Sequence, residues 1–364
     1  MNILISKKGV KTVKISESKW TLKDEHFGLL LPYIQDDNVT DINYNGEDVW
    51  IDDLINGRYK SDIVLTNEFV NQFSTKIADI VSENFNQYEP LLEAETETLR
   101  ISIIHESVAN TGRSISIRKT PIIKRFDEQK AISENYCSKE VLRLLKNCIN
   151  GKMNMVMCGL PGTGKTELLK FLTGYIPEND RVITIEDNLE IHYRKINPGK
   201  DCVELKVNDD RFSYIKAIKA CLRQNPQWIL LSEARSAEVK YLIESLSTGT
   251  HCLTTLHTDD VRKVPDRIKN MVQDSITEER MENDAYNFLD VGILVRKKEV
   301  NKKIIRYIDQ LCFYSREKGG KNIAVMIVDN GRVINKEMPS EIMNKFKIYG
   351  IDDPFGASIL DEEE

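Results

Sequence analysis

The eight residues at 159–166 read GLPGTGKT, which places two glycines, a lysine and a threonine at the spacing of a phosphate-binding loop. An apolar stretch at 153–158 precedes them, and residues 167–172 carry apolar side chains at helical spacing. An ordinary Gly/Pro-rich turn is the alternative, but a strand before it and a helix after it favour the phosphate loop. The backbone N–H groups and the helix N-terminus would then face phosphate oxygens. The residues predicted to surround the phosphates are Gly159, Pro161, Gly162, Thr163, Gly164, Lys165, Thr166 and Glu167.

Strands and helices alternate through the second half of the chain. Near-continuous apolar runs at 182–185, 228–231 and 252–256 read as strands covered on both faces. Helical patterns at 212–223 and 237–247 lie between them. This alternation predicts an α/β fold with a parallel sheet.

The first part of the chain has a different pattern. An amphipathic helix at 69–81 is followed by alternating apolar and polar residues at 99–104 and 114–118, as in half-buried strands. A charged segment with Pro121 reads as a linker. We therefore predict a smaller N-terminal α+β domain, a linker, a P-loop domain and a solvated acidic tail, at residues 1–120, 121–138, 139–350 and 351–364.

Composition excludes several classes of protein. The net charge is −6 and the pI about 5.6, which argues against general nucleic-acid binding. No apolar run approaches the ~18 residues of a membrane-spanning helix, and the first residues lack the pattern of a signal peptide. The seven cysteines contain no C-x-x-C pair, which fits a reducing compartment with thiols as apolar fillers. We expect a soluble, cytoplasmic protein without a transmembrane segment.

Chemically active residues follow three of the predicted strands. Glu186 and Asp187 follow the first, Glu233 and Arg235 the second, and His257 the third. Parallel sheets bind ligands at the carboxyl ends of their strands, so these groups would meet the phosphate loop. Carboxylates there can orient water or hold Mg²⁺, and a histidine can contact a terminal phosphate. Acidic residues after strands are also common helix N-caps, and a lone histidine is often structural.

Four motifs in order resemble those of the secretion-superfamily ATPases, hexameric motors of type IV pili and of type II and type IV secretion. The first is the phosphate loop, and the second reads IEDNLE at 185–190, like the family's Asp box. The third reads SEAR at 232–235, like an atypical Walker B motif. The fourth runs TGTH at 248–251 and TLHT at 255–258, like the family's His box. Weaker matches, PLLEA at 90–94 and SISIRK at 114–119, resemble the VirB11/CpaF-like branch.

The resemblance implies a RecA-like P-loop ATPase domain behind a smaller, PAS-like N-terminal domain. It implies ATP and Mg²⁺ as cofactors, with Thr166 and Glu233 as metal ligands. It also implies a homo-hexamer that associates peripherally with the inner face of the cell membrane, as part of a secretion or pilus machine. The catalytic residues would be Lys165, Glu186 as general base, Glu233 as Walker B acid and His257 as γ-phosphate sensor. The N-terminal domain would bring arginines to the nucleotide, namely Arg100, Arg113 and Arg118.

Several positions depart from the family pattern. Gln227 stands where an aspartate is usual, Ser232 replaces a glycine, and His251 follows Thr250 one place late. Gln310 stands where the branch usually has an acid. We therefore keep two alternatives to a secretion motor: a nucleotide-switched scaffold with weak hydrolysis, and a pilus-retraction motor. A basic run between 296 and 306 keeps a nucleic-acid motor open, although such runs are usually solvated hairpins.

Overall fold

The computed structural model describes residues 22–208, 211–272 and 275–357, and the chain forms two compact units. Unit 1 ends at Pro121 and also takes in Glu299–Ile304, and unit 2 comprises Ile122–Lys298 and the residues from Ile305 onwards. No helix in the described ranges is long and apolar enough to cross a membrane.

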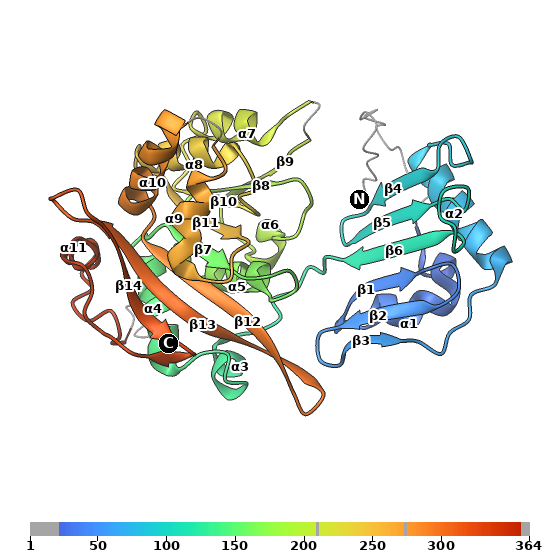
Figure 1. Ribbon diagram of the computed structural model, residues 1–364, viewed down its shortest axis with the longest axis horizontal. Helices are drawn as coiled ribbons and strands as arrows, with labels where there is room; N and C mark the ends of the chain where they lie inside the picture. Colours follow the sequence, from blue (N-terminus) through green and yellow to red (C-terminus); the bar gives the residue numbers. More distant parts are fainter. Residues whose placement is uncertain (1–21, 209–210, 273–274, 358–364) are drawn as a thin grey trace. The chain divides into compact units, whose positions relative to one another are not determined.

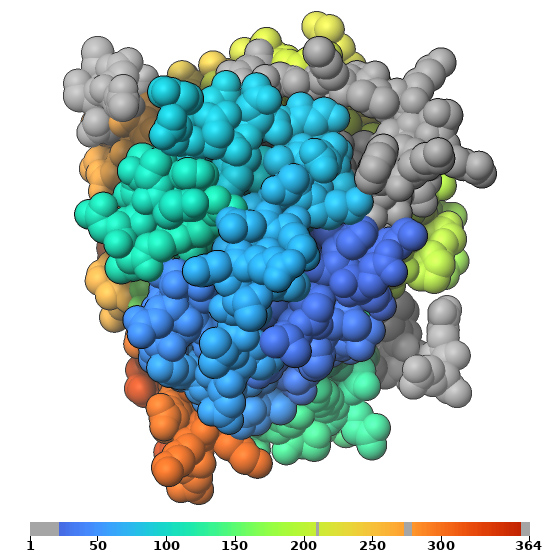
Figure 2. Space-filling model, turned by 90° about the vertical axis from the view of Figure 1, so that its right-hand side faces the viewer, coloured from blue at the N-terminus to red at the C-terminus, as the bar shows by residue number. Residues whose placement is uncertain are grey.

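Unit 1 is a six-stranded antiparallel sheet in the order β3-β2-β1-β6-β5-β4, with one long helix. Helix α2 begins where the Thr66 hydroxyl accepts the Phe69 N–H at 3.2 Å, and ends at Ser82 in the left-handed region. Its apolar face packs on alternate strand residues such as Ile42 and Ile117, which are fully buried. The surface of this unit is blue to teal in Figure 2. Its elements are a 3-10 helix at Asp24–Leu30, α1 (Leu31–Gln35), β1 (Val39–Tyr44), β2 (Val49–Asp53), β3 (Gly57–Lys60), α2 (Asn67–Val81), β4 (Leu91–Glu95), β5 (Leu99–Ile104) and β6 (Ser114–Lys119).

Unit 2 is built on a nine-stranded sheet in the order β15-β14-β13-β12-β7-β11-β10-β8-β9 (Figure 1). The strands from β12 to β9 in this order are parallel neighbours, while β13–β14 and β14–β15 are antiparallel pairs. The strands are β7 (Met155–Cys158), β8 (Val182–Glu186), β9 (Cys202–Lys206), β10 (Trp228–Leu231), β11 (His251–Leu256), β12 (Val291–Val300), β13 (Lys303–Arg316), β14 (Asn322–Asp329) and β15 (Arg332–Val333).

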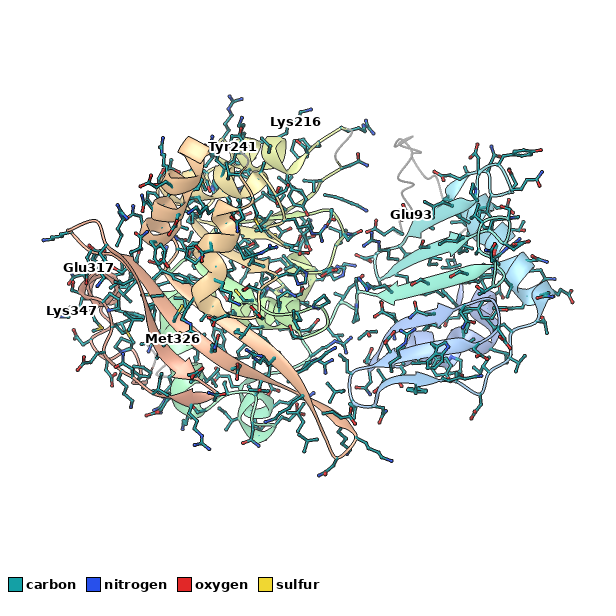
Figure 3. All side chains as sticks on the ribbon, in the orientation of Figure 1. Glu93, Lys216, Tyr241, Glu317, Met326 and Lys347 are labelled. Atoms are coloured by element: carbon teal, nitrogen blue, oxygen red, sulfur yellow. The ribbon has the colours of Figure 1, made fainter. Side chains whose placement is uncertain are left out.

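Helices cover both faces of this sheet, because alternate residues of each buried strand point to opposite sides. Met155 and Leu230 pack with α4, α5 and α11, whereas Val156 and Leu231 pack with α7, α8, α9 and α10. Between α7 and α8, the Lys219 ammonium lies 4.3 Å from the ring centroid of Tyr241, the α8 residue labelled in Figure 3. The helices are α3 (Glu128–Ser133), α4 (Lys139–Asn150), α5 (Lys165–Leu172), α6 (Tyr193–Ile196), α7 (Tyr214–Cys221), α8 (Glu238–Leu246), α9 (Val264–Lys269), α10 (Ser275–Phe288) and α11 (Ser340–Ile348), with 3-10 turns at Thr173–Tyr175 and Val261–Lys263.

Two segments differ from the sequence prediction. The predicted linker at 121–138 contains helix α3, and its Ala131 and Tyr136 are buried in the core of unit 2. The predicted acidic tail begins with residues that also pack there: Ile351 and Phe355 join the same core, and the Asn147 side chain donates to the Pro354 carbonyl. The acidic residues at 361–364 lie outside the described residues.

Candidate nucleotide-binding site

The loop between β7 and α5 has the backbone conformation that its glycines permit. Gly159, Gly162 and Gly164 have φ of 149°, 73° and 97°, in the region that favours glycine. A methyl group on Gly159 would lie 2.5 Å from both the Thr163 hydroxyl and the Val295 carbonyl oxygen. The loop is therefore closely packed at its start, and it leads directly into the N-terminus of α5.

Lys165, His257 and Glu233 meet beside this loop, as their places in the sequence predicted. The Lys165 ammonium donates to the carbonyls of Gly159 and Leu160 at 3.0 and 3.2 Å, and lies 3.2 Å from His257 Nδ1. His257 Nε2 is 2.9 Å from Glu233 Oε1. Lys165 is only 8% exposed, and this burial lowers the pKa of its ammonium while the nearby Glu233 opposes the shift. Loop carbonyls thus hold the lysine at a place where phosphate oxygens could replace them.

The chain of contacts continues through Arg235. Its Nε donates to Glu233 Oε2 at 2.8 Å, and its terminal nitrogen donates to Asp187 at 2.7 Å. Asp187 also accepts the Tyr214 hydroxyl at 3.1 Å. Burial acts to raise the pKa of Asp187, but Arg235, the Tyr214 hydroxyl and the Asn188 N–H together hold that pKa below its ordinary value. Arg235 therefore joins the ends of β8 and β10, and both oxygens of Glu233 are engaged.

Glu186, the predicted general base, is enclosed by the loop that follows β8. Its carboxylate is fully buried, and its Oε2 accepts the backbone N–H groups of Glu190 and Ile191 at 2.9 and 3.0 Å. Its other oxygen has no partner among the described residues, and burial raises the pKa of this carboxyl group to about 8. The side chain thus caps the loop after β8, because two amides of that loop face the strand end.

Glu190, the second glutamate of the same motif, reaches the phosphate loop. Thr166 Oγ1 donates to Glu190 Oε2 at 3.3 Å, and the Glu190 side chain is half-buried. The signal for it was present, since the motif carries two glutamates four residues apart. Which glutamate faces the loop depends on the backbone after β8, which the sequence does not reveal.

The Glu167 side chain contacts cations of unit 2. Its carboxylate lies 3.4 Å from the Lys170 ammonium and 3.8 Å from the Arg125 guanidinium. Only its backbone N–H remains suited to a phosphate, because an anionic side chain would repel one.

Three of the residues that depart from the family pattern make structural contacts within unit 2. His251 begins β11, at the sheet edge opposite the phosphate loop, and packs beside Trp228 with ring centroids 5.3 Å apart. Burial lowers its pKa to about 4. Gln227 accepts the Arg181 N–H, and Gln310 accepts the Val261 N–H and donates to Asp329. These side chains support strand ends and connections within unit 2.

Two of the arginines predicted to clamp the nucleotide have acidic partners within unit 1. Arg113 binds both oxygens of Glu106 at 2.7 and 2.9 Å, and Arg118 donates to Asp41 at 2.8 Å. The second of these pairs joins β6 to β1 across the sheet.

Arg100 lies in one row with Arg118 across the sheet of unit 1. It stands opposite Arg118 in the β5–β6 pair and opposite Glu95 in the β4–β5 pair. Arg118 stands opposite Asp41 in the β1–β6 pair, so two arginines lie between two acids. This charged row gives the arginines a role in the sheet, and their role in nucleotide binding stays a prediction.

Comparison with known proteins identifies the family of this chain. Residues 91–338 match the family described as Type II/IV secretion system protein. An uncharacterised protein of Bacillus anthracis is 26% identical over 296 residues, which span 77% of this chain and 66% of that protein. The type IV secretion system protein VirB11 of Bartonella quintana is 28% identical over 192 residues, which span 49% of this chain and 53% of VirB11.

The fold has solved counterparts. The structure of the pilus retraction motor PilT with bound ADP is 20% identical, with a TM-score of 0.56 over 77% of this chain and 80% of that one. This likeness confirms the predicted fold, a RecA-like domain that follows a smaller N-terminal domain. The chain belongs to the type II/IV secretion system protein family.

Proposed function

We propose that this protein binds and hydrolyses ATP, and that it acts as a subunit of a ring-forming motor. The observation that carries the proposal is the convergence of Lys165, His257, Glu233 and Glu190 on one glycine-rich loop. Three strand ends supply the last three of these residues, as expected for a ligand site at the carboxyl edge of a parallel sheet. The bound ADP of PilT and the family's secretion ATPases support the choice of nucleotide.

Each residue has a distinct part in the proposed reaction. Lys165 would leave the loop carbonyls and bind the β- and γ-phosphates. The Thr166 hydroxyl offers an oxygen ligand of the kind that Mg²⁺ prefers. When bound, Mg²⁺ would neutralise charge that develops on the phosphates. Glu190 would orient the attacking water. His257 would contact the γ-phosphate, and a shift of its ring would change its contact with Glu233.

The family also supports a proposal for the biological setting. We propose a homo-hexamer that works on the cytoplasmic side of the cell membrane, as a peripheral component of a secretion, pilus or conjugation machine. The relatives support this setting, since one is a type IV secretion protein and another a putative conjugal transfer protein of Mycobacterium tuberculosis. Phosphate release measured with three variants tests the enzymatic part.

Lys165→Ala should abolish hydrolysis, because the main cation of the site is lost. Glu190→Gln should retain nucleotide binding but lower turnover by ~10²-fold or more, because the neutral amide neither orients nor deprotonates water as well. Glu186→Gln is the matched control, with the same chemical change four residues away, and should stay within a few-fold of wild type. Wild-type turnover in Glu190→Gln, together with a large loss in Glu186→Gln, would return the role to Glu186.

A nucleotide-switched scaffold is the second candidate, and one observation favours it. Both oxygens of Glu233 are already engaged, by His257 and Arg235, so the acid must be released before it can serve the reaction. If the protein is a scaffold, the wild type should bind ATP tightly but release phosphate at nearly the same rate as Glu190→Gln. A motor would show a clear difference between wild type and that variant.

A further inference from the structure

A pair of cations on the β12–β13 hairpin lies against the phosphate loop. These two residues, Lys297 and Arg306, belong to the basic run that the sequence suggested was a solvated hairpin. Arg306 Nε donates to the Gly162 carbonyl at 3.3 Å, and its Cδ lies 3.5 Å from where a methyl group on Gly164 would stand. The Lys297 ammonium lies 3.3 Å from the corresponding position on Gly162. Both residues are part of unit 2, so the contact is internal to it.

The Arg306 contact falls at the carbonyl end of one peptide group. In a trans peptide the C=O of Gly162 and the N–H of Thr163 point in opposite directions. Within the described ranges, the Thr163 N–H makes a single long bond of 3.4 Å, to the Leu160 carbonyl. A cation at the carbonyl end polarises the group and strengthens the donor at its other end. Arg306 therefore strengthens the Thr163 N–H as a donor.

The loop also needs such support for an entropic reason. Three glycines with left-handed φ make it costly to hold in one conformation. Arg306 comes from a strand of the central sheet and ties the middle of the loop to that sheet. No hydrogen bond or ion pair joins the Lys297 ammonium to another of the described residues, so its charge is available to an anion at the loop.

We propose that Arg306 is a positioning residue for nucleotide binding, which aims the Gly162–Thr163 peptide at the bound phosphates, and that Lys297 adds attraction for them. This inference rests on the proposed nucleotide-binding function. Loop N–H groups cradle the α- and β-phosphates, which ADP and ATP share. The loss of Arg306 should therefore weaken both nucleotides equally and raise KM without changing kcat, because the contact is the same in the ground and transition states.

The test compares Arg306→Met, Arg306→Lys and Lys297→Met with wild type, using the full chain. Titration with fluorescent ADP and with a non-hydrolysable ATP analogue should show Kd raised roughly tenfold in Arg306→Met, by the same factor for both ligands. Arg306→Lys should recover part of this loss, and Lys297→Met should show a smaller loss in the same direction. Arg332→Gln, which removes an exposed arginine from β15 of the same sheet, should bind as wild type.

Four results would decide against the inference. Arg306→Met could bind ADP as wild type does, or lose affinity only for the ATP analogue, which would place Arg306 at the γ-phosphate. It could lower kcat with KM unchanged, which would indicate a role in the chemical step. It could also lose thermal stability without nucleotide in proportion to the lost affinity, with no recovery in Arg306→Lys, which would make the contact structural. If wild type bound neither ligand, the proposed function itself would fail, which is a distinct outcome.

Discussion

At the scale of single residues, burial rather than residue type separates the two glutamates of the Asp-box segment. Glu186 is enclosed by its own loop, whereas Glu190 is half-buried and reaches the Thr166 hydroxyl. A buried carboxyl group with one unpartnered oxygen is easier to keep protonated than ionised. Its pKa of about 8 therefore makes a prediction about stability.

Stability should fall as the pH rises from about 4.5 to about 8 because of Glu186. The folded state keeps the proton up to the higher value, while the unfolded state loses it near the ordinary value of 4.5. The folded state thus binds more protons within this window, and its stabilisation is lost as the pH rises, on the order of a few kcal/mol in all. Glu186→Gln should remove this dependence, because its amide oxygen can still accept both backbone N–H groups.

Urea unfolding of wild type and Glu186→Gln at pH 5.5, 7 and 8.5 measures the difference. The variant should gain stability relative to wild type as the pH rises. A difference that stays constant across the three pH values would show that Glu186 is ionised in the folded protein, and that its burial does not set its charge.

The sequence predicted the residues of the site better than their orientation. Lys165, His257 and Glu233 were placed correctly beside the loop, because strand ends in a parallel sheet share one edge. The enclosure of Glu186 was not predictable, since the amides that enclose it depend on a backbone turn without a distinctive residue pattern. Arg306 was treated as part of a solvated hairpin, because its contact with Gly162 spans 144 positions of the sequence.

At the scale of elements, strands with continuous apolar runs were predictable and short polar strands were not. The runs at 182–185, 228–231 and 252–256 correspond to β8, β10 and β11. The sequence analysis missed β9, none of whose residues is fully buried, and the strands β1, β2, β3 and β4. It also missed β13, a strand of 14 residues, although residues 308–315 of that strand are buried. Local periodicity does not reveal such strands, because their pairing with distant neighbours stabilises them.

The charged row on the sheet of unit 1 carries the next prediction. Arg118→Ala and Asp41→Asn both remove the ion pair, and each should cost under about 1 kcal/mol of stability without nucleotide, because the arginine is 57% exposed. If Arg118 also clamps nucleotide, only Arg118→Ala should weaken the binding of fluorescent ADP. Asp41→Asn is the matched control, since it breaks the same pair but keeps the arginine.

Equal ADP affinity in Arg118→Ala, Asp41→Asn and wild type would leave Arg118 with a role in the sheet alone. Thermal melting of the same samples shows whether a lost affinity merely follows lost folding. The same comparison applies to Arg100→Ala, whose cross-strand neighbours are Arg118 and Glu95.

At the scale of the whole molecule, the proposed motor requires an assembly. Arg235 and His257 hold Glu233 within a single chain, so its release must accompany the arrival of nucleotide. In a ring, that release could change the contacts of a subunit with its neighbours. Nucleotide and assembly should therefore be linked, since a ligand that binds the assembled form better also promotes assembly.

We expect hexamers in the presence of Mg²⁺ and a non-hydrolysable ATP analogue, measured by multi-angle light scattering at tens of micromolar protein. Lys165→Ala is the control, because it lacks the main phosphate-binding cation and should show no nucleotide-dependent assembly. Mixing Glu190→Gln with wild type gives a second measurement. If subunits act in turn around a ring, hydrolysis should fall more steeply than the wild-type fraction. A monomer under every nucleotide condition, with hydrolysis in strict proportion to that fraction, would contradict the ring and leave an ATPase whose subunits act alone.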